Sequence, residues 1–122
     1  MIGFNRNGSL TIQTLSSHGI YAATLTSTTL PLNAWTHACM TYSLAHGIQL
    51  FVNGSLKAYN TTFTDYSPRA ARYTITVGTC LQPNTCAVNQ TKIVTSQFQG
   101  KIDELYIFSR ELSSVEINNL IV

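Results

Sequence analysis

Charged side chains are scarce in this sequence. Asp, Glu, Lys and Arg make up only 10% of its 122 residues, and the formal net charge is +2. So small a charge, without any cluster of Lys or Arg, gives no electrostatic basis for binding nucleic acid. No apolar run approaches the about 20 residues that a membrane-spanning helix needs, so we expect no membrane insertion. The N-terminus, MIGFNRNG, also lacks a basic segment followed by an apolar one, so the signal of a secreted protein would lie outside this chain.

Acidic residues are especially few, and they are scattered along the chain. The five are Asp65, Asp103, Glu104, Glu111 and Glu116. Glycoside hydrolysis needs two carboxylates on either side of the scissile bond, whereas the neighbouring Asp103 and Glu104 would point to opposite faces of a strand. Enzymatic activity is therefore the least favoured class of function. A calcium site needs several converging oxygen ligands, so we expect no metal and no cofactor, with Asp103 as a weak candidate for calcium.

The sequence contains only three cysteines. Cys80 and Cys86 lie on either side of a Pro-Asn turn, a spacing that favours a disulfide closing a small loop. The alternative, a metal site, lacks partners because the histidines are distant and no CxxC motif exists. Cys39 is left over, and we expect a buried, inert thiol in a strand; an interchain bridge is the alternative.

What the sequence does contain is Thr, Ser and Asn among short alternating apolar segments, which is typical of strands. Asn7-Gly8 and Asn53-Gly54 are hairpin signals, and Pro31 indicates a loop over Ser27–Asn33. Several short strands separated by turns predict an antiparallel sandwich in a single domain, residues 1–122. The predicted strands are Ser9–Leu15, Ile20–Thr26, Trp35–Tyr42, Ile48–Val52, Ser55–Tyr59, Tyr73–Val77 and Lys101–Ser109, with a partial strand at Phe4.

The end of the chain has the strongest local pattern. Lys101–Ser109 carries apolar residues on both faces, so we expect a strand covered on both sides in its second half. Asp103 shares a face with Leu105, and we expect its carboxylate to be buried and bonded to backbone N–H groups; exposure to solvent is an alternative. Ser113 and Glu116 then match a capping box, which predicts a short helix closing the domain.

Three segments together resemble a known family. WTHACMTY (35–42), IQLFVNG (48–54) and FQGKIDELYIFSRELSSVEI (98–117) are similar to laminin-G-like domains of the concanavalin A-like lectin/glucanase superfamily. The resemblance implies an all-β, antiparallel jelly-roll sandwich with a short C-terminal helix, and a structural role for His37. Its N-terminal part fits less well. Either strands are missing there, or a trimmed sandwich has its edge covered by something else, for instance in an edge-strand dimer.

The resemblance also implies a function. Most such domains are non-catalytic extracellular or cell-surface modules that bind carbohydrate or protein ligands within a larger protein; the alternatives are a structural spacer and, less favoured, a glycoside hydrolase. Aromatic rings stack on sugars and arginines hold hydroxyls or acidic groups. The candidate ligand-binding residues are Tyr59, Tyr66, Arg69 and Arg72. Four N-x-[ST] sequences, at Asn7, Asn53, Asn60 and Asn89, are candidate glycosylation sites and favour the secretory pathway.

Overall fold

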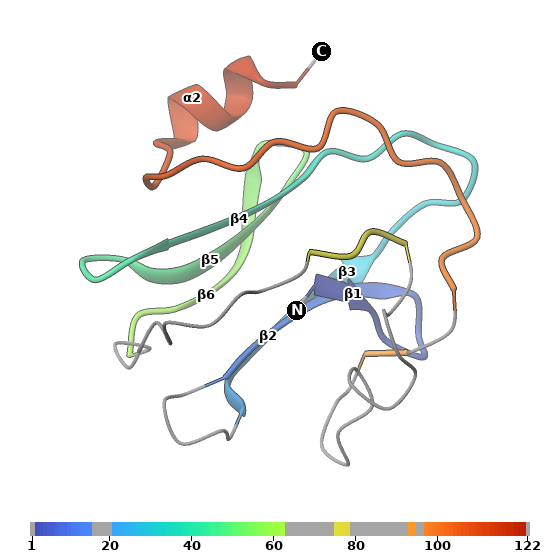
Figure 1. Ribbon diagram of the computed structural model, residues 1–122, viewed down its shortest axis with the longest axis horizontal. Helices are drawn as coiled ribbons and strands as arrows, with labels where there is room; N and C mark the ends of the chain where they lie inside the picture. Colours follow the sequence, from blue (N-terminus) through green and yellow to red (C-terminus); the bar gives the residue numbers. More distant parts are fainter. Residues whose placement is uncertain (1, 16–20, 63–74, 79–92, 95–96, 122) are drawn as a thin grey trace.

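A computed structural model describes residues 2–15, 21–62, 75–78, 93–94 and 97–121 of the chain. Its elements form two antiparallel three-stranded sheets and one short helix (Figure 1). The first sheet has the strand order β1 (Ile2–Phe4), β2 (Ser9–Leu15) and β3 (Tyr21–Thr29), and the second has β4 (Ala38–Ser43), β5 (Gly47–Val52) and β6 (Ser55–Asn60). The helix α2 spans Ser114–Asn119.

The first sheet begins with the hairpin that the sequence predicts. Phe4 of β1 lies opposite Leu10 of β2, and Asn5 Oδ1 accepts hydrogen bonds from the backbone N–H groups of Asn7 and Ser9. Gly8 has a φ of 78°, which a residue without Cβ adopts readily. The hairpin prediction is therefore confirmed. The next strand, β3, runs three residues beyond the predicted end at Thr26, into the predicted loop.

The second sheet is a meander of three consecutive strands. Asn53 and Gly54 connect β5 to β6, and their φ values of 48° and 74° are the two positive values that a type I′ turn requires. The side chain of Asn53 also accepts a hydrogen bond from the backbone N–H of His37, and its own N–H donates to the His37 carbonyl. This pair of bonds fixes the chain just before β4, but it uses only the backbone of His37, so a structural role for the imidazole stays a prediction.

The main core lies between the two sheets. Apolar side chains of β5 and of the first sheet meet there, and they lose nearly all contact with water. The buried residues of this cluster are Leu10, Ile12, Leu25, Ile48, Leu50 and Val52. Each such side chain contributes roughly 1.5–3 kcal/mol when it leaves water, so this layer holds the sandwich together.

The other face of the second sheet is covered by the end of the chain. Phe51 of β5 points away from the main core and forms a second cluster with Leu112 and Ile117, against which Cys39 and Leu120 pack. Ser113 Oγ accepts a hydrogen bond from the Glu116 backbone N–H, and the Glu116 side chain accepts one from the Ser113 N–H. The predicted capping box is therefore confirmed, and Leu112 before it packs in the same cluster as Ile117 within the helix. β5 is consequently a central strand that is buried on both faces.

The predicted strand Lys101–Ser109 is wrong. Residues 101–110, which we call the arm, run without pairing to any of the described strands (Figure 1). All ten are exposed. The backbone φ of Glu104 is 51°, outside the extended region, so the run is interrupted there. Asp103 is exposed, and its Oδ1 accepts a hydrogen bond from the Glu104 N–H. Its expected burial is therefore wrong, because none of the described segments forms a second layer over this part of the chain.

Two further strand predictions differ from the structure. β4 begins at Ala38, so Trp35 lies ahead of the strand, with 69% of its surface exposed. Residues 75–77, the described part of the predicted strand Tyr73–Val77, are not in a strand. Ile75 and Val77 are exposed there, and apolar alternation alone does not give them a pairing partner.

Candidate functional site

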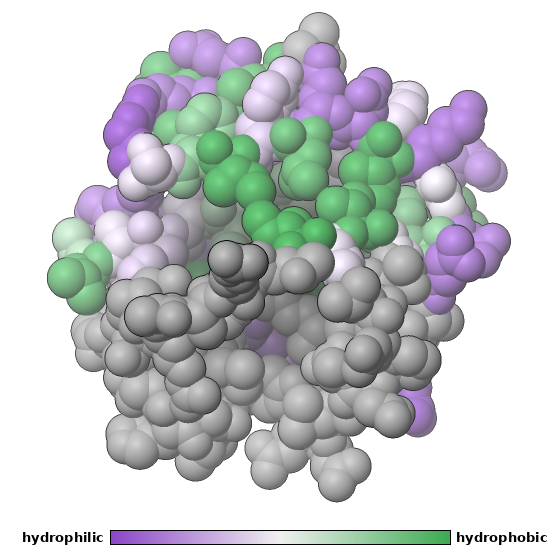
Figure 2. All heavy atoms as spheres, in the orientation of Figure 1, coloured by the Kyte–Doolittle hydropathy of each residue, from purple (hydrophilic) through white to green (hydrophobic). Residues whose placement is uncertain are grey.

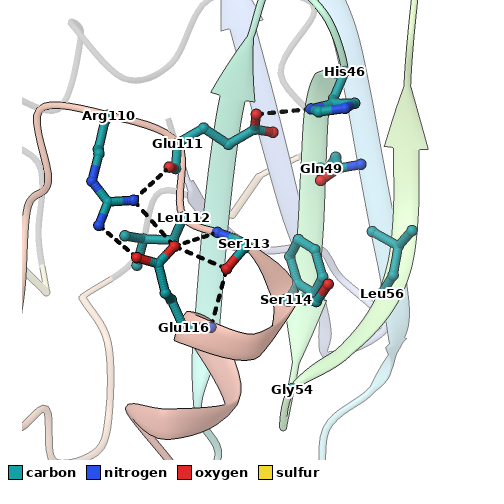
Figure 3. A pocket seen from close by; sticks show the side chains of 11 residues that line it. His46, Gln49, Gly54, Leu56, Arg110, Glu111, Leu112, Ser113, Ser114 and Glu116 are labelled. Carbon is teal, nitrogen blue, oxygen red and sulfur yellow. Dashed lines mark hydrogen bonds and ion pairs between the residues drawn. The ribbon is translucent and has the colours of Figure 1, made fainter.

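A groove of about 640 Å³ lies where the second sheet meets the segment that leads into α2 (Figure 3). Gln49 and Phe51 of β5 and Leu56 of β6 line it on the sheet side, and His46 lies at the hairpin before β5. The other wall consists of residues 110–114 and Glu116. The volume lies in the usual range of ligand pockets, so the groove is the candidate site.

The first polar contact in the groove joins two segments that are far apart in sequence. His46 Nδ1 lies 2.8 Å from Glu111 Oε2, and the Ser43 hydroxyl accepts a hydrogen bond from the His46 backbone N–H. Burial raises the pKa of Glu111, but hydrogen bonds from His46 and Ser43 outweigh that effect and leave this pKa below its ordinary value. The Glu111 carboxylate is therefore kept ionised and fixed against the hairpin.

A second ion pair lies at the other end of the same wall. Arg110 donates from both terminal nitrogens to the Glu116 carboxylate, with Nη2 lying 2.6 Å from Oε1 (Figure 3). The Arg110 guanidinium, followed by the Ser113 backbone N–H and hydroxyl, lowers the pKa of Glu116 to about 2. The same hydrogen bond raises the pKa of Arg110. Arg110 and Glu116 thus neutralise each other inside the groove, and Glu111 has a hydrogen-bond partner there in His46.

Several polar atoms remain available to a ligand. Gln49 Oε1 accepts a hydrogen bond from the Thr41 hydroxyl, whereas its amide nitrogen makes no hydrogen bond to the described residues. The Ser114 hydroxyl and His46 Nε2 are likewise without a partner in that part of the chain. Donors and acceptors next to the apolar surfaces of Phe51 and Leu56 suit a ligand that carries both hydroxyl groups and C–H faces.

Tyr59, a candidate from the sequence, belongs to the same face of the sheet. It lies directly opposite Gln49 in the β5–β6 register, and directly opposed residues of an antiparallel pair share a face. Its side chain is 62% exposed, so its ring is accessible beside the groove. The other three candidates, Tyr66, Arg69 and Arg72, lie outside the described residues.

The remaining sequence predictions are located as follows. Cys39 is half-buried in β4 with a free thiol, and burial raises the pKa of this thiol. Cys80 and Cys86 lie outside the described residues, as does Asn89. Asn7 and Asn53 are exposed and Asn60 is half-buried, and their glycosylation stays a prediction.

No group of three His, Cys, Asp or Glu side chains that could hold a metal ion occurs among the described residues, and no helix there is long and apolar enough to cross a bilayer.

The sequence did not predict the groove itself. His46 was not singled out, Gln49 was expected only within the strand Ile48–Val52, and Glu111 was expected as one scattered acid. The contact between His46 and Glu111 spans 65 residues. No local pattern reports such a contact, because it depends on how α2 docks on the second sheet.

Comparison with known families agrees with this architecture. A laminin-G-like family model, described as the concanavalin A-like lectin/glucanases superfamily, matches residues 1–118. The chain therefore belongs to this superfamily, and its sandwich is of the jelly-roll type that the sequence predicted. The search of curated proteins gave no match.

One solved structure is also similar. It is the crystal structure of residues 221–444 of an S-layer domain-containing protein from Clostridium thermocellum ATCC 27405, with 27% sequence identity and a TM-score of 0.58. The match covers 94% of this chain and 52% of the solved one, so the chain spans about half the length of that structure. Family and neighbour together indicate a module of the kind that occurs in surface proteins.

Proposed function

We propose that this chain is a non-catalytic recognition module of a secreted or cell-surface protein, and that its groove, with Tyr59 beside it, binds a neutral glycan. The observation that carries the proposal is the internal pairing of charge in the groove. Arg110 pairs with Glu116, and the Glu111 carboxylate is hydrogen-bonded to His46, so no charged side chain of the groove is left without a partner for a charged ligand to bind. The available groups are an amide, a hydroxyl and an imidazole nitrogen, next to apolar surface.

The ligand class follows from these groups. A sugar hydroxyl both donates and accepts a hydrogen bond, so Gln49, Ser114 and His46 could each bind one. The C–H face of a sugar ring is apolar and packs against an aromatic side chain, and the exposed ring of Tyr59 is available for this. A protein loop rich in Ser, Thr or Asn offers similar groups and is the second candidate ligand.

The two carboxylates of the groove argue against hydrolysis. A glycosidase needs a carboxylic acid that is protonated at working pH, which requires a raised pKa. Here the pKa values of Glu111 and Glu116 are both lowered by their partners. Neither group is suited to donate a proton to a leaving sugar, which supports a binding role.

A glycan array with added calcium, repeated with a chelator, tests this function. We expect binding to a restricted set of neutral glycans, unchanged by calcium. Gln49→Ala and Tyr59→Ala should each weaken it, by roughly fivefold to tenfold for about 1 kcal/mol of lost contact. Arg6→Ala, an exposed position in the turn between β1 and β2, is the control. Binding that survives both groove variants would place the ligand elsewhere, and no binding at all would favour the spacer role.

A further inference from the structure

The arm presents an unusual amount of apolar surface. Ile102, Leu105, Tyr106, Ile107 and Phe108 follow one another closely, and their exposed fractions lie between 46% and 71%. Among the described residues, the backbone of residues 101–109 makes no backbone–backbone hydrogen bond. Figure 2 shows apolar side chains gathered on one face of the molecule, next to polar ones. A strand-like segment with free N–H and C=O groups is a template for pairing with another strand.

The apolar area that the arm exposes is comparable with the largest apolar patch of a typical monomer. With side chains of this size, the five residues leave on the order of 500 Å² of apolar surface in water, close to the largest patch of a typical monomer. A standard interface buries about 800 Å² per partner. The arm, together with its backbone and the flanking charged residues, approaches that size.

We propose that two copies of this chain associate through their arms, paired as antiparallel strands with Ile107 opposite Ile107 of the second copy. A two-fold axis perpendicular to the new sheet relates the two strands of such a pair, so a given residue points to the same face of the sheet in both copies. Residues that lie opposite each other share a face, and side chains alternate between faces along a strand. The numbers of two opposed residues must therefore differ by an even number. This leaves three central residues to consider, Leu105, Tyr106 and Ile107.

The side chains that lie opposite each other distinguish these three registers. With Ile107 on the axis, Glu104 lies opposite Arg110 of the second copy, and Tyr106 lies opposite Phe108. With Leu105 on the axis, Asp103 would lie opposite Ile107 and Glu104 opposite Tyr106. With Tyr106 on the axis, Glu104 would lie opposite Phe108. The Tyr106 register would also join opposite charges, Lys101 with Glu111, but only the Ile107 register adds an aromatic pair to its charge pair, and both kinds of pair favour strand pairing.

The local backbone agrees with this register. The positive φ of Glu104 ends the extended run on one side, and the bend at Ser109 and Arg110 ends it on the other. The run between them, residues 105–108, contains Ile107 and both residues of the aromatic pair. Arg110 uses its two terminal nitrogens for Glu116 and the Glu111 carbonyl, which leaves its Nε–H for Glu104 of the second copy. Glu111 turns into the groove toward His46, so pairing ends before it.

Sedimentation velocity over a range of concentrations tests the association. We expect the 122-residue chain to reach twice its single-chain mass at micromolar concentration and above. Ile107→Asp places two carboxylates against each other on the axis and should return the chain to the single-chain mass. Leu56→Asp, an exposed apolar position on β6, is the matched control and should stay dimeric. Circular dichroism checks that both variants fold, which their exposure favours.

A cysteine variant tests the register independently. Ile107→Cys brings two thiols together on the axis and should give a covalent dimer on oxidation, whereas Lys57→Cys should not. A chain that stays monomeric at several hundred micromolar overturns the proposal. Protection of the arm's amides from hydrogen exchange in that monomer would show that the chain itself covers the arm. A dimer that persists in Ile107→Asp and is not crosslinked by Ile107→Cys overturns this interface.

Discussion

The central strand β5, Gly47–Val52, and the arm, residues 101–110, both have apolar side chains on two faces. In β5 these side chains are buried, with Leu50 fully inaccessible, because the first sheet covers one face and α2 the other. In the arm the same kind of side chain is exposed, and Ile107 retains 71% of its surface. The difference shows that an apolar pattern records a preference for burial, whereas the cover itself comes from distant parts of the chain.

The largest expected effect contrasts the two regions directly. Leu50→Ala removes a fully buried side chain and should lower the free energy of unfolding by about 3 kcal/mol. Leu105→Ala, in the arm, should change it by less than about 0.5 kcal/mol. Urea denaturation at low concentration measures both, since dilution keeps association through the arm out of the comparison. Equal losses would mean that the arm is covered in solution.

The sequence predicts local contacts better than contacts between distant parts of the chain. Where strands pair with their neighbours in sequence, alternation and turn residues were sufficient. The hairpin at Asn7-Gly8, the turn at Asn53-Gly54 and the capping box of Ser113 are all local signals, and all three are confirmed.

Features that depend on distant contacts were not predicted correctly. The arm was predicted as a buried strand because its pattern equals that of β5, and no local signal indicates that its partner is absent among the described residues. The groove was missed for the same reason, since His46 and Glu111 meet only after α2 docks. Tyr59 was predicted for its ring and proved to lie on the groove face because of its register with Gln49.

A second prediction concerns the cover on the outer face of β5. Gly54 has a φ of 74°, and a Cβ there would collide with Asn118 of α2 and approach Ile121. Gly54→Ala should therefore cost about 2–3 kcal/mol, from backbone strain plus displacement of the helix. Gly78→Ala has a similar φ, but its Cβ would meet only Ile102 at 4.0 Å, an ordinary van der Waals contact, so its loss should stay near 1 kcal/mol. If thermal unfolding gives equal losses, α2 does not depend on close approach at the turn.

A third prediction weakens the same helix from its own end. Ser113→Ala removes the hydroxyl that caps α2 and should cost about 1 kcal/mol. The cap also holds Glu116, so fluorescence of an extrinsic dye that binds apolar surface should rise as Phe51 loses its cover. Ser114→Ala, at an exposed neighbouring hydroxyl, is the control and should have little effect. A Ser113→Ala variant as stable as the control would show that packing of Ile117 alone holds the helix.

The smallest expected effect is a dependence of the free energy of unfolding on pH, caused by the Arg110–Glu116 pair where the arm joins α2. The folded-state pKa of Glu116 is about 2, below its ordinary value of 4.5, because Arg110 and Ser113 bind the ionised form. As the pH falls, Glu116 is therefore protonated at a higher pH in the unfolded chain than in the folded chain. The stabilisation by the ionised carboxylate is complete above about pH 4.5 and is lost as the pH falls toward 2. Because Glu116 is exposed, salt should weaken the effect. Urea midpoints between pH 6 and pH 2.5 should fall less in Glu116→Gln than in the wild type. Parallel curves for the two proteins would mean that the Arg110–Glu116 pair contributes nothing to stability, and that the arm is joined to the helix by the backbone alone.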